Sequence, residues 1–206
     1  MRIAIVGGTG TFGRALAKRL HRLGEDVVIG SRDAQRGAEK AIELGVQGGA
    51  NEEVVQGADL VVLATKSNAA LETGSSLADA IGETPVLCVA SDLRFTDNGV
   101  VPGLEDGSLA ETLASLLSAP VASGLQTISA IDLSRPELPD QDALICGDDP
   151  RAKQLALELA GRLVGGRAID AGPLANSRAL EGMTAVILNV NKEFGVHAGL
   201  RVTGLP

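Results

Sequence analysis

The chain has 206 residues, of which 45% are hydrophobic and 21% are charged, and its formal net charge is −8. This length and composition fit one full α/β domain with a modest addition. The acidic balance disfavours nucleic acid as a partner, and three phenylalanines with no Trp or Tyr offer no stacking surface for single strands.

The first half of the chain alternates between strand-like and helix-like segments. We expect strands at residues 2–6, 26–30, 58–65 and 85–90, a helix that carries Leu16, Leu20 and Leu23, and further helices at residues 33–44 and 68–81. The strand at residues 58–65 is continuously apolar, as in parallel strands that are covered on both faces. This alternation predicts an α/β fold, a Rossmann-type doubly wound parallel sheet with a small C-terminal α/β extension.

The second half predicts a loop at residues 91–107, a helix at 109–117, strands at 121–125, 143–146 and 167–170, and a last helix at about 175–192. Asp149 and Pro150 are typical of the N-cap and the first position of a helix. Prolines in residues 135–142 mark a boundary. We therefore predict a dinucleotide-binding domain at residues 1–140 and a C-terminal extension at residues 141–206.

A glycine motif directly follows the first predicted strand. Residues 8–13 read Gly-Thr-Gly-Thr-Phe-Gly, which matches GxGxxG, and they open a helix within a βαβ unit of the expected length. We expect Gly8 to permit the tight turn, Gly10 to let the backbone approach a pyrophosphate, and Gly13 to let the helix pack close to the strand. The motif predicts a dinucleotide site.

The end of the second strand indicates which dinucleotide binds. The Arg32 guanidinium can form a bidentate hydrogen bond to a 2′-phosphate, and the Ser31 hydroxyl can donate to the same phosphate. Arg36 lies one helical turn further on and could add positive charge. The competing interpretation makes Asp33 the ligand of the ribose hydroxyls and the protein NAD-dependent. We favour NADP, with Asp33 as the cap of the following helix.

The sequence resembles the NADPH-dependent reductases of the deazaflavin coenzyme F420, the F420H2:NADP oxidoreductases, over nearly the whole chain. The N-terminal glycine motif and Ser31-Arg32 carry part of the resemblance. The C-terminal part is more specific: residues 146–149 (CGDD), 170–174 (DAGPL) and 197–205 (HAGLRVTGL). The resemblance implies hydride exchange between the nicotinamide and the deazaflavin, with both rings held face to face, and a dimer.

Three segments depart from the pattern of that family. Family members commonly carry proline after the strands that match residues 58–65 and 85–90, where this chain has residues 65–68 (TKSN) and 91–94 (SDLR). Members usually place a histidine near the deazaflavin, where this chain has Gln126. Glutamine can donate a hydrogen bond to a ring carbonyl but cannot carry a proton near neutral pH. The alternative is that Gln126 faces solvent.

These considerations assign a set of site residues. No catalytic residue is certain, and Gln126 and Ile128 are the expected contacts of the substrate ring. The expected cofactor-binding residues are Gly8, Thr9, Gly10, Thr11, Phe12, Gly13, Ser31, Arg32, Arg36, Thr65, Lys66 and Ala130. Cations that could bind the anionic tail of the deazaflavin are Arg94, Arg178, Lys192 and Arg201, with ordinary surface charge as the alternative. We expect no metal site, because the cysteines and histidines lack the necessary number and spacing.

The same analysis predicts partners and location. The last helix is apolar on several faces, so we expect it to be buried at a homodimer interface, or else inside the monomer. No apolar run approaches the roughly 20 residues of a membrane span, and we expect a cytoplasmic protein with Cys88 and Cys146 reduced in buried strands. Two other functions stay open: an NADP-dependent reductase of a different acceptor, and a non-catalytic NADP-binding protein.

Overall fold

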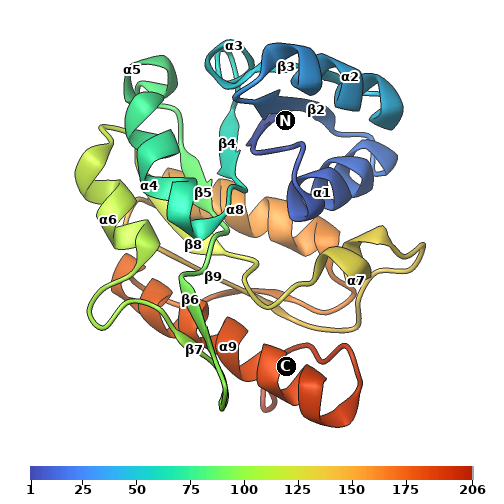
Figure 1. Cartoon of the computed structure of the whole chain (residues 1–206), viewed down its shortest axis with the longest axis vertical. Helices are drawn as coiled ribbons and strands as arrows, with labels where there is room; N and C mark the ends of the chain where they lie inside the picture. The colour runs from blue at the N-terminus through green and yellow to red at the C-terminus, as the bar shows by residue number, and fades with distance from the viewer. Residues whose placement is uncertain (206) are drawn as a thin grey trace.

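A computed structural model describes residues 1–205 as one eight-stranded sheet with helices on both faces (Figure 1). The strands of this sheet are β1 (Arg2–Val6), β2 (Asp26–Ser31), β3 (Gln47–Ala50), β4 (Leu60–Leu63), β5 (Val86–Cys88), β8 (Val121–Gly124), β9 (Ala143–Gly147) and β10 (Ala168–Asp170). The helices are α1 (Thr11–Arg22), α2 (Ala34–Leu44), α3 (Asn51–Val54), α4 (Ser67–Ser76), α5 (Ala78–Ile81), α6 (Leu109–Leu116), α7 (Ala130–Ser134), α8 (Pro150–Leu163) and α9 (Ser177–Phe194). A short 3-10 turn, η1 (Leu174–Asn176), precedes α9.

The strand order is β10-β9-β8-β5-β4-β1-β2-β3. The six strands from β8 to β3 pair in parallel, which confirms the doubly wound sheet and brings their carboxyl ends to one edge. One core lies between the sheet and α1, α2 and α8, and a second lies between the sheet and α3 to α6. Continuous burial of β1, β4 and β5 follows from this double cover.

The C-terminal segment continues this sheet. Strand β9 pairs antiparallel with β8, and β10 then pairs parallel with β9, so the sheet is mixed at this side. The parallel prediction therefore fails for one strand pair. The cause is connectivity: α7 and the loop after it return the chain to the carboxyl edge, where β9 begins in the opposite direction. The boundary between residues 140 and 141 stays a prediction.

Several elements were missed by the sequence analysis. The predicted loop at residues 91–107 contains a hairpin of β6 (Leu93–Thr96) and β7 (Gly99–Pro102). Strand β3 was also missed, and glycines on both elements let α2 pack closely against it: a Cβ on Gly37 would lie 2.2 Å from the Gly49 carbonyl oxygen, and one on Gly48 would lie 2.7 Å from the Ala41 Cβ. Helices α3 and α7 are too short to show helical periodicity. Sequence periodicity is weak evidence for elements of this length.

Helix α9 lies across the carboxyl ends of β5 and β8. The Thr184 hydroxyl bonds to the Ser91 hydroxyl at 2.9 Å and donates to the Gln126 carbonyl at 3.1 Å. The side chain of Asn189 holds the hairpin by bonding to both the N–H and the carbonyl of Val100, at 2.9 Å and 2.7 Å. These bonds place α9 and the hairpin beside the edge where ligands bind in open sheets.

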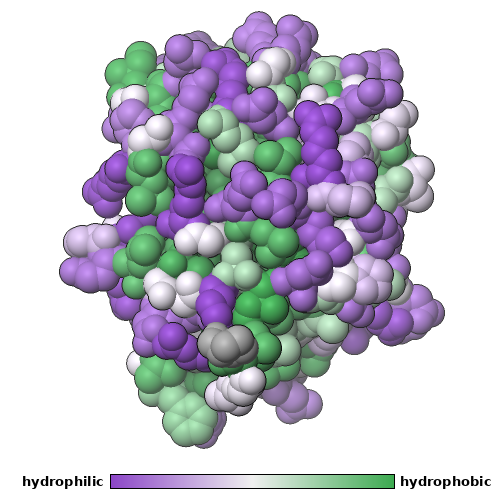
Figure 2. All heavy atoms as spheres, turned by 180° about the vertical axis from the view of Figure 1, so that it is seen from behind, coloured by the Kyte–Doolittle hydropathy of each residue, from purple (hydrophilic) through white to green (hydrophobic). Residues whose placement is uncertain are grey.

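The buried face of α9 is narrow. Its buried side chains are Ser177, Leu180, Glu181 and Ala185, while Val186 and Phe194 are exposed. Figure 2 shows hydrophobic side chains gathered in the lower half of the molecule, where α9 and the C-terminal segment lie. The helix is therefore only partly buried inside the monomer: Met183, Ile187, Leu188 and Val190 are half-buried, and the homodimer interface stays a prediction.

No helix within residues 1–205 is long and apolar enough to cross a membrane.

Candidate functional site

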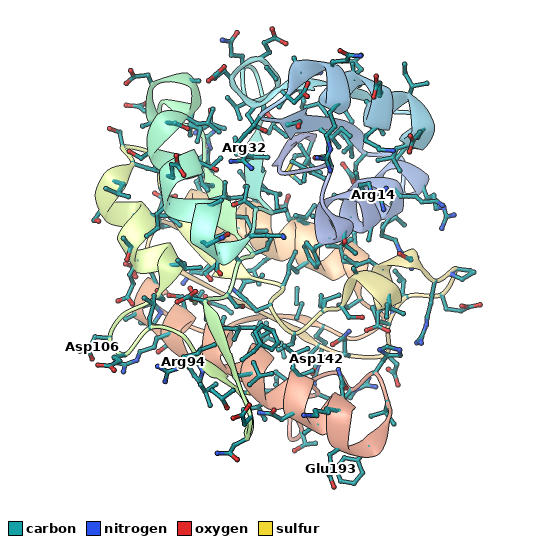
Figure 3. All side chains as sticks on the ribbon, in the orientation of Figure 1. Arg14, Arg32, Arg94, Asp106, Asp142 and Glu193 are labelled. Atoms are coloured by element: carbon teal, nitrogen blue, oxygen red, sulfur yellow. The ribbon has the colours of Figure 1, made fainter. Side chains whose placement is uncertain are left out.

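The predicted cofactor segments meet at the carboxyl edge of the sheet. Strand β1 is flanked by β2 and β4, with Val6 opposite Gly30 on one side and Leu63 on the other. The glycine loop after β1, Ser31 and Arg32 at the end of β2, and Thr65 and Lys66 after β4 therefore lie at neighbouring strand ends (Arg32 is labelled in Figure 3). Residues 7–13, 31–32 and 65–66 together form the edge on which the cofactor prediction rests, called the cofactor edge below.

Close packing explains most of the glycine loop. Gly7 has φ +80°, a conformation that L side chains rarely adopt, whereas Gly8 does not have a positive φ. The tight turn thus depends on Gly7, and the role predicted for Gly8 is wrong. A Cβ on Gly8 would lie 2.5 Å from the Cβ of Ile29, and one on Gly13 would lie 2.5 Å from the Gly7 carbonyl oxygen. Gly8 lets the loop approach β2, and Gly13 lets α1 pack close to the loop that follows β1, where close packing to the strand was predicted.

Gly10 differs from the other glycines of the motif. A Cβ there would meet only the Gly7 carbonyl oxygen, at 3.3 Å, so the space beyond it is open. Gly10 is also the N-cap of α1, and no side chain caps this helix. The helix therefore presents backbone N–H groups and the positive end of its dipole to the open space. This geometry fits a pyrophosphate.

The end of β2 has the chemistry expected for a 2′-phosphate. Asp33 accepts from the backbone N–H of Arg36 at 3.1 Å and is the N-cap of α2, as predicted. Ser31 is buried, and its hydroxyl oxygen accepts from the Asp33 N–H at 3.3 Å, which leaves the hydroxyl proton for another acceptor. Arg32 and Arg36 are exposed. The Asp33 carboxylate caps α2, so it is engaged by the helix rather than by a ribose. The cations of Arg32 and Arg36 remain exposed and can bind a 2′-phosphate.

The end of β4 carries an unsatisfied group. The Oγ1 of Thr65 is buried and has no hydrogen-bond partner within the described residues. Its methyl group lies close to Gly7, since a Cβ added there would be 3.0 Å from it. A buried hydroxyl without a partner costs about 1–3 kcal/mol. A polar ligand beside the glycine loop would supply the missing partner. Lys66 is exposed next to it.

Gln126 points into the protein. Its amide nitrogen donates to Ser123 Oγ at 2.7 Å and to the Cys88 carbonyl at 3.4 Å, and the residue is only 9% exposed. The alternative that Gln126 faces solvent is therefore wrong. Both amide protons are engaged within the protein, which leaves the side-chain carbonyl oxygen for a ligand.

The backbone at this turn is strained. Leu125, directly before Gln126, has φ 69°, the one non-glycine residue with positive φ in the described chain. Such a conformation costs of order 1–3 kcal/mol and is common at ligand sites. The Ile128 N–H donates to the Leu125 carbonyl at 3.1 Å, and Ile128 is buried in the core under α1 and α8. The turn fixes where the chain leaves β8.

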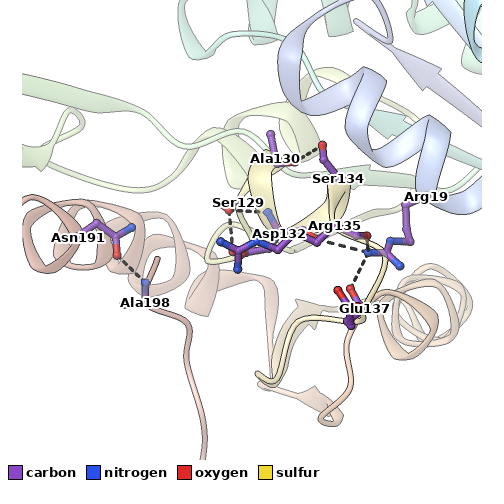
Figure 4. Close-up of polar contacts among 9 residues, drawn as sticks. All are labelled: Arg19, Ser129, Ala130, Asp132, Ser134, Arg135, Glu137, Asn191 and Ala198. Carbon is purple, nitrogen blue, oxygen red and sulfur yellow. Dashed lines mark hydrogen bonds and ion pairs between the residues drawn. The ribbon is translucent and has the colours of Figure 1, made fainter. Parts of the chain in front are cut away.

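Arg19 on α1 was not identified from the sequence. Its buried guanidinium donates to the carbonyls of Leu133 at 3.1 Å, Pro136 at 3.0 Å and Glu137 at 2.8 Å. It also donates to the carbonyls of Asp132 and Arg135. These carbonyls lie at the end of α7 and just after it (Figure 4). Arg19 thus fixes α7, and with it Ala130, against α1.

The other end of α7 is capped locally. The Ser129 hydroxyl accepts from the Asp132 N–H at 3.0 Å and donates to the Asp132 carboxylate at 2.6 Å. Arg135 pairs with the same carboxylate at 3.2 Å. This short helix is therefore held at both ends, although five residues alone do not make a stable helix.

A second cavity lies on the α6 side of α9. It has a volume of about 540 Å³ and is lined by α9, η1 and the segment that leads to α6. Glu181, at 5% exposure, accepts from the Ala110 N–H at 3.3 Å and lies against Asp92. Burial raises the pKa of the Glu181 carboxyl to about 7, and the negative charge of Asp92 adds to the effect.

Two of the cations proposed for an anionic tail have partners within the chain. Arg178 donates to the Glu105 carbonyl and pairs with Asp106 at 3.5 Å, and Arg201 pairs with Asp140. Arg94 lies on the hairpin, far from Arg32 in Figure 3. Arg178 thus contacts the loop before α6, and Arg201 links the C-terminal segment to Asp140.

The C-terminal segment is fixed at Asp142. The buried Asp142 carboxylate accepts from Arg167 and from the backbone N–H of Val202, at 2.9 Å each. The hydrogen bonds from Arg167 hold the pKa of Asp142 well below its usual range. Asn191 on α9 binds the same segment by accepting from the Ala198 N–H at 2.6 Å (Figure 4).

The cysteines are buried as predicted. Cys88 and Cys146 are inaccessible in β5 and β9, and burial raises the pKa of both thiols to about 12. A protonated thiol is a weak nucleophile. The residues described contain no cluster of His, Cys, Asp and Glu that could hold a metal ion.

Relatives that match over the full length of the chain share one name, F420-dependent NADP reductase. Residues 2–91 match the family model described as NADP oxidoreductase, coenzyme F420-dependent. The chain is 36% identical to the F420-dependent NADP reductase of Methanothermobacter marburgensis, with 100% of both chains covered. It is 31% identical to the F420-dependent NADP reductase of Methanocaldococcus jannaschii, covering 100% of this chain and 99% of that protein.

A solved structure supports the same relationship. A crystal structure from Arthrobacter sp. FB24, provisionally assigned as an F420-dependent NADP reductase, superposes with a TM-score of 0.85 and 27% identity. The superposition covers 99% of this chain and 100% of that one. The likeness therefore extends from the glycine loop to the C-terminal segment.

Proposed function

Because the chain belongs to the family of F420-dependent NADP reductases, we propose that it is an oxidoreductase that transfers a hydride between NADP(H) and the deazaflavin coenzyme F420. The observation that carries this proposal is the cofactor edge, where the open space at Gly10 and the buried, unpartnered hydroxyl of Thr65 lie on either side of Gly7. Both features suit a dinucleotide, and the relatives' names state which one they use.

The proposed roles follow the edge of the sheet. The N–H groups of Thr11, Phe12 and Gly13 at the start of α1 would bind the pyrophosphate, and Thr9 lies in the same loop. Ser31, Arg32 and Arg36 would bind the 2′-phosphate, whereas Thr65, Lys66 and Ala130 would line the nicotinamide half.

The chemistry places few demands on the protein. NADPH supplies the hydride, and the residues of the chain position the two rings and exclude water. Gln126, held by Ser123 and Cys88, would present its carbonyl oxygen to the substrate ring, and Ile128 would support that turn from the core. No ionisable side chain of this turn needs to carry a proton.

We also propose a homodimer. The exposed side of α9 carries Val186 and Phe194, and Leu205 in the C-terminal segment is exposed too. Exposed apolar areas of this kind mark protein interfaces. The domain boundary at residues 140 and 141 fits this proposal, because the extension would supply both the dimer contact and one wall of the substrate site.

The first test is direct. Mixing the protein with NADPH and oxidised coenzyme F420 should bleach the visible absorbance of the deazaflavin, while NADH in place of NADPH should do so much more slowly. Absence of bleaching, with NADPH binding shown by calorimetry, would contradict the proposed acceptor. Consumption of NADPH with another carbonyl or imine would then identify a reductase with a different substrate.

A substitution tests the cofactor assignment. Arg32→Ala should weaken NADP binding by about 1–3 kcal/mol, the size of a charge-assisted hydrogen bond, because the 2′-phosphate loses its guanidinium partner. Binding of NAD should change little. Titration calorimetry with both cofactors measures the difference, and Arg151→Ala on the exposed side of α8 is a matched control. Equal losses for NADP and NAD would rule out the 2′-phosphate role.

A further inference from the structure

A groove of about 630 Å³ runs between α1 and α7. One wall is formed by residues of α1 and the other by residues of α7, and the C-terminal end of α2 closes the far end. The near end is lined by Thr11 and Ala130, which are both proposed to contact the cofactor. The groove therefore begins at the proposed active site and leads away from it.

The groove is basic in an acidic protein. Arg14 and Lys18 lie one turn apart on α1, and Arg135 lies on the opposite wall. Arg14 and Lys18 are exposed, and neither has an ion-pair partner among residues 1–205 (Arg14 is labelled in Figure 3). Glu43 is the one acid in the lining, and Lys40 pairs with it at 2.5 Å. With a net charge of −8, the chain has few places where unpaired cations gather.

The walls of the groove are rigid. Arg19 emerges from the buried face of α1 and binds the carbonyls at the end of α7, so the spacing of the two helices is fixed. The same guanidinium neutralises the negative end of α7, which would otherwise repel an anion. Arg135 keeps its charge near the groove, since its pairing with Asp132 uses one nitrogen.

We propose that this groove binds the anionic tail of the deazaflavin substrate. The inference rests on the proposed function. The tail of coenzyme F420 carries a phosphodiester and glutamate carboxylates, which match the unpaired cations of Arg14 and Lys18 and the nearby guanidinium of Arg135. The route is short in sequence: Gln126 is the proposed ring contact, Ile128 supports its turn from the core, and α7 begins at Ala130. A tail that leaves the ring along this segment enters the groove.

The assignment replaces the earlier one for the tail. Arg178 and Arg201 are paired with Asp106 and Asp140, so binding a tail there would require those pairs to break. Arg14 and Lys18 need no such rearrangement. Unpaired cations beside the cofactor site are the better partners for a multiply charged anion.

The test compares two substrates in one variant. In Arg14→Gln/Lys18→Gln, the KM and the fluorescence-measured Kd for coenzyme F420 should rise about tenfold. Both constants should stay unchanged for the tail-less deazaflavin core, which lacks the phosphate and the glutamates. The Kd for NADPH should also stay unchanged. The control Arg22→Gln/Arg151→Gln removes the same charge from exposed positions outside the groove lining and should behave like the wild type.

The outcomes separate this inference from the proposed function. If the wild type reduces coenzyme F420 and the groove variant has an unchanged Kd for it, the groove assignment is overturned and the function stands. Equal losses for the tailed and tail-less substrates, or a weaker Kd for NADPH, would also overturn it. If the wild type reduces neither substrate, the proposed function fails, and unchanged binding of coenzyme F420 in the variant would then reject the groove as well.

Discussion

Replacing Arg19 with methionine is expected to lower the free energy of unfolding by about 1–3 kcal/mol, the cost of leaving buried polar groups without their hydrogen-bond partner. The guanidinium satisfies carbonyls of Leu133, Pro136 and Glu137, among others, that are held against α1. Methionine fills similar space but donates no hydrogen bond, so these carbonyls lose their partners. Urea unfolding followed by circular dichroism measures the change.

A matched control lies on the same helix. Arg22 is exposed and donates no hydrogen bond to the described residues, so Arg22→Met should change stability by less than about 0.5 kcal/mol. Arg19→Lys should be nearly as damaging as Arg19→Met, because a single ammonium cannot reach carbonyls spread over six residues. If Arg19→Met unfolded no more easily than Arg22→Met, the clamp on α7 would not be structural.

The same variant should weaken cofactor binding. Arg19 does not touch the proposed site, but it fixes α7, whose first residue Ala130 lies beside Thr11 in the groove lining. Release of α7 would let this wall move, so the Kd for NADPH should rise even at temperatures where the variant remains folded. A folded Arg19→Met protein with the wild-type Kd would show that α7 does not contribute to the cofactor site.

Arg19 shows why part of the site could not be predicted. Its carbonyl partners lie 113 to 118 residues further along the chain, and a backbone carbonyl has no sequence signature. By contrast, the caps at Asp33 and Asp149 were predicted because each depends on an N–H three residues away. Local chemistry could be read from the sequence, whereas tertiary hydrogen bonds could not.

The glycine motif was predicted for the right region but with one role misassigned. Its spacing identifies the βα turn, yet only the backbone shows that Gly7 takes the positive φ and that Gly8 approaches Ile29. Gln126 is similar. The sequence showed an unusual residue after β8, but the direction of its amide depends on Ser123 and Cys88 in neighbouring strands. Both the role of Gly8 and the direction of the Gln126 side chain depend on contacts with neighbouring strands, which the local sequence does not show.

Helix α9 illustrates how burial of a carboxylate affects stability. Glu181 lies in a helix whose apolar side chains suggested an interface, and its own role was not foreseen. The structure places it against α6, where the Ala110 N–H donates to it, and beside the like charge of Asp92. Desolvation outweighs the backbone donors, and this raises the pKa of Glu181 to about 7 from the 4.5 of a free carboxyl.

This shift predicts a pH dependence that one substitution should remove. Between pH 4.5 and 7 the native state keeps a proton on Glu181 that the unfolded chain has released, so stability should fall as pH rises through this window, by about 3 kcal/mol in total. Glu181→Gln cannot titrate. The difference in unfolding free energy between wild type and variant should therefore change across the window and be flat above it.

Subtracting the variant from the wild type removes the contribution of the other groups. Urea unfolding of both proteins at intervals from pH 4.5 to pH 8 gives the difference curve. The exposed Glu158 on α8 provides the control, since Glu158→Gln should leave the curve parallel to that of the wild type. A difference curve for Glu181→Gln that is flat throughout would mean that this carboxylate is ionised in the native state across the window. The contact between α9 and α6 would then hold a charge that the surrounding backbone donors fully compensate.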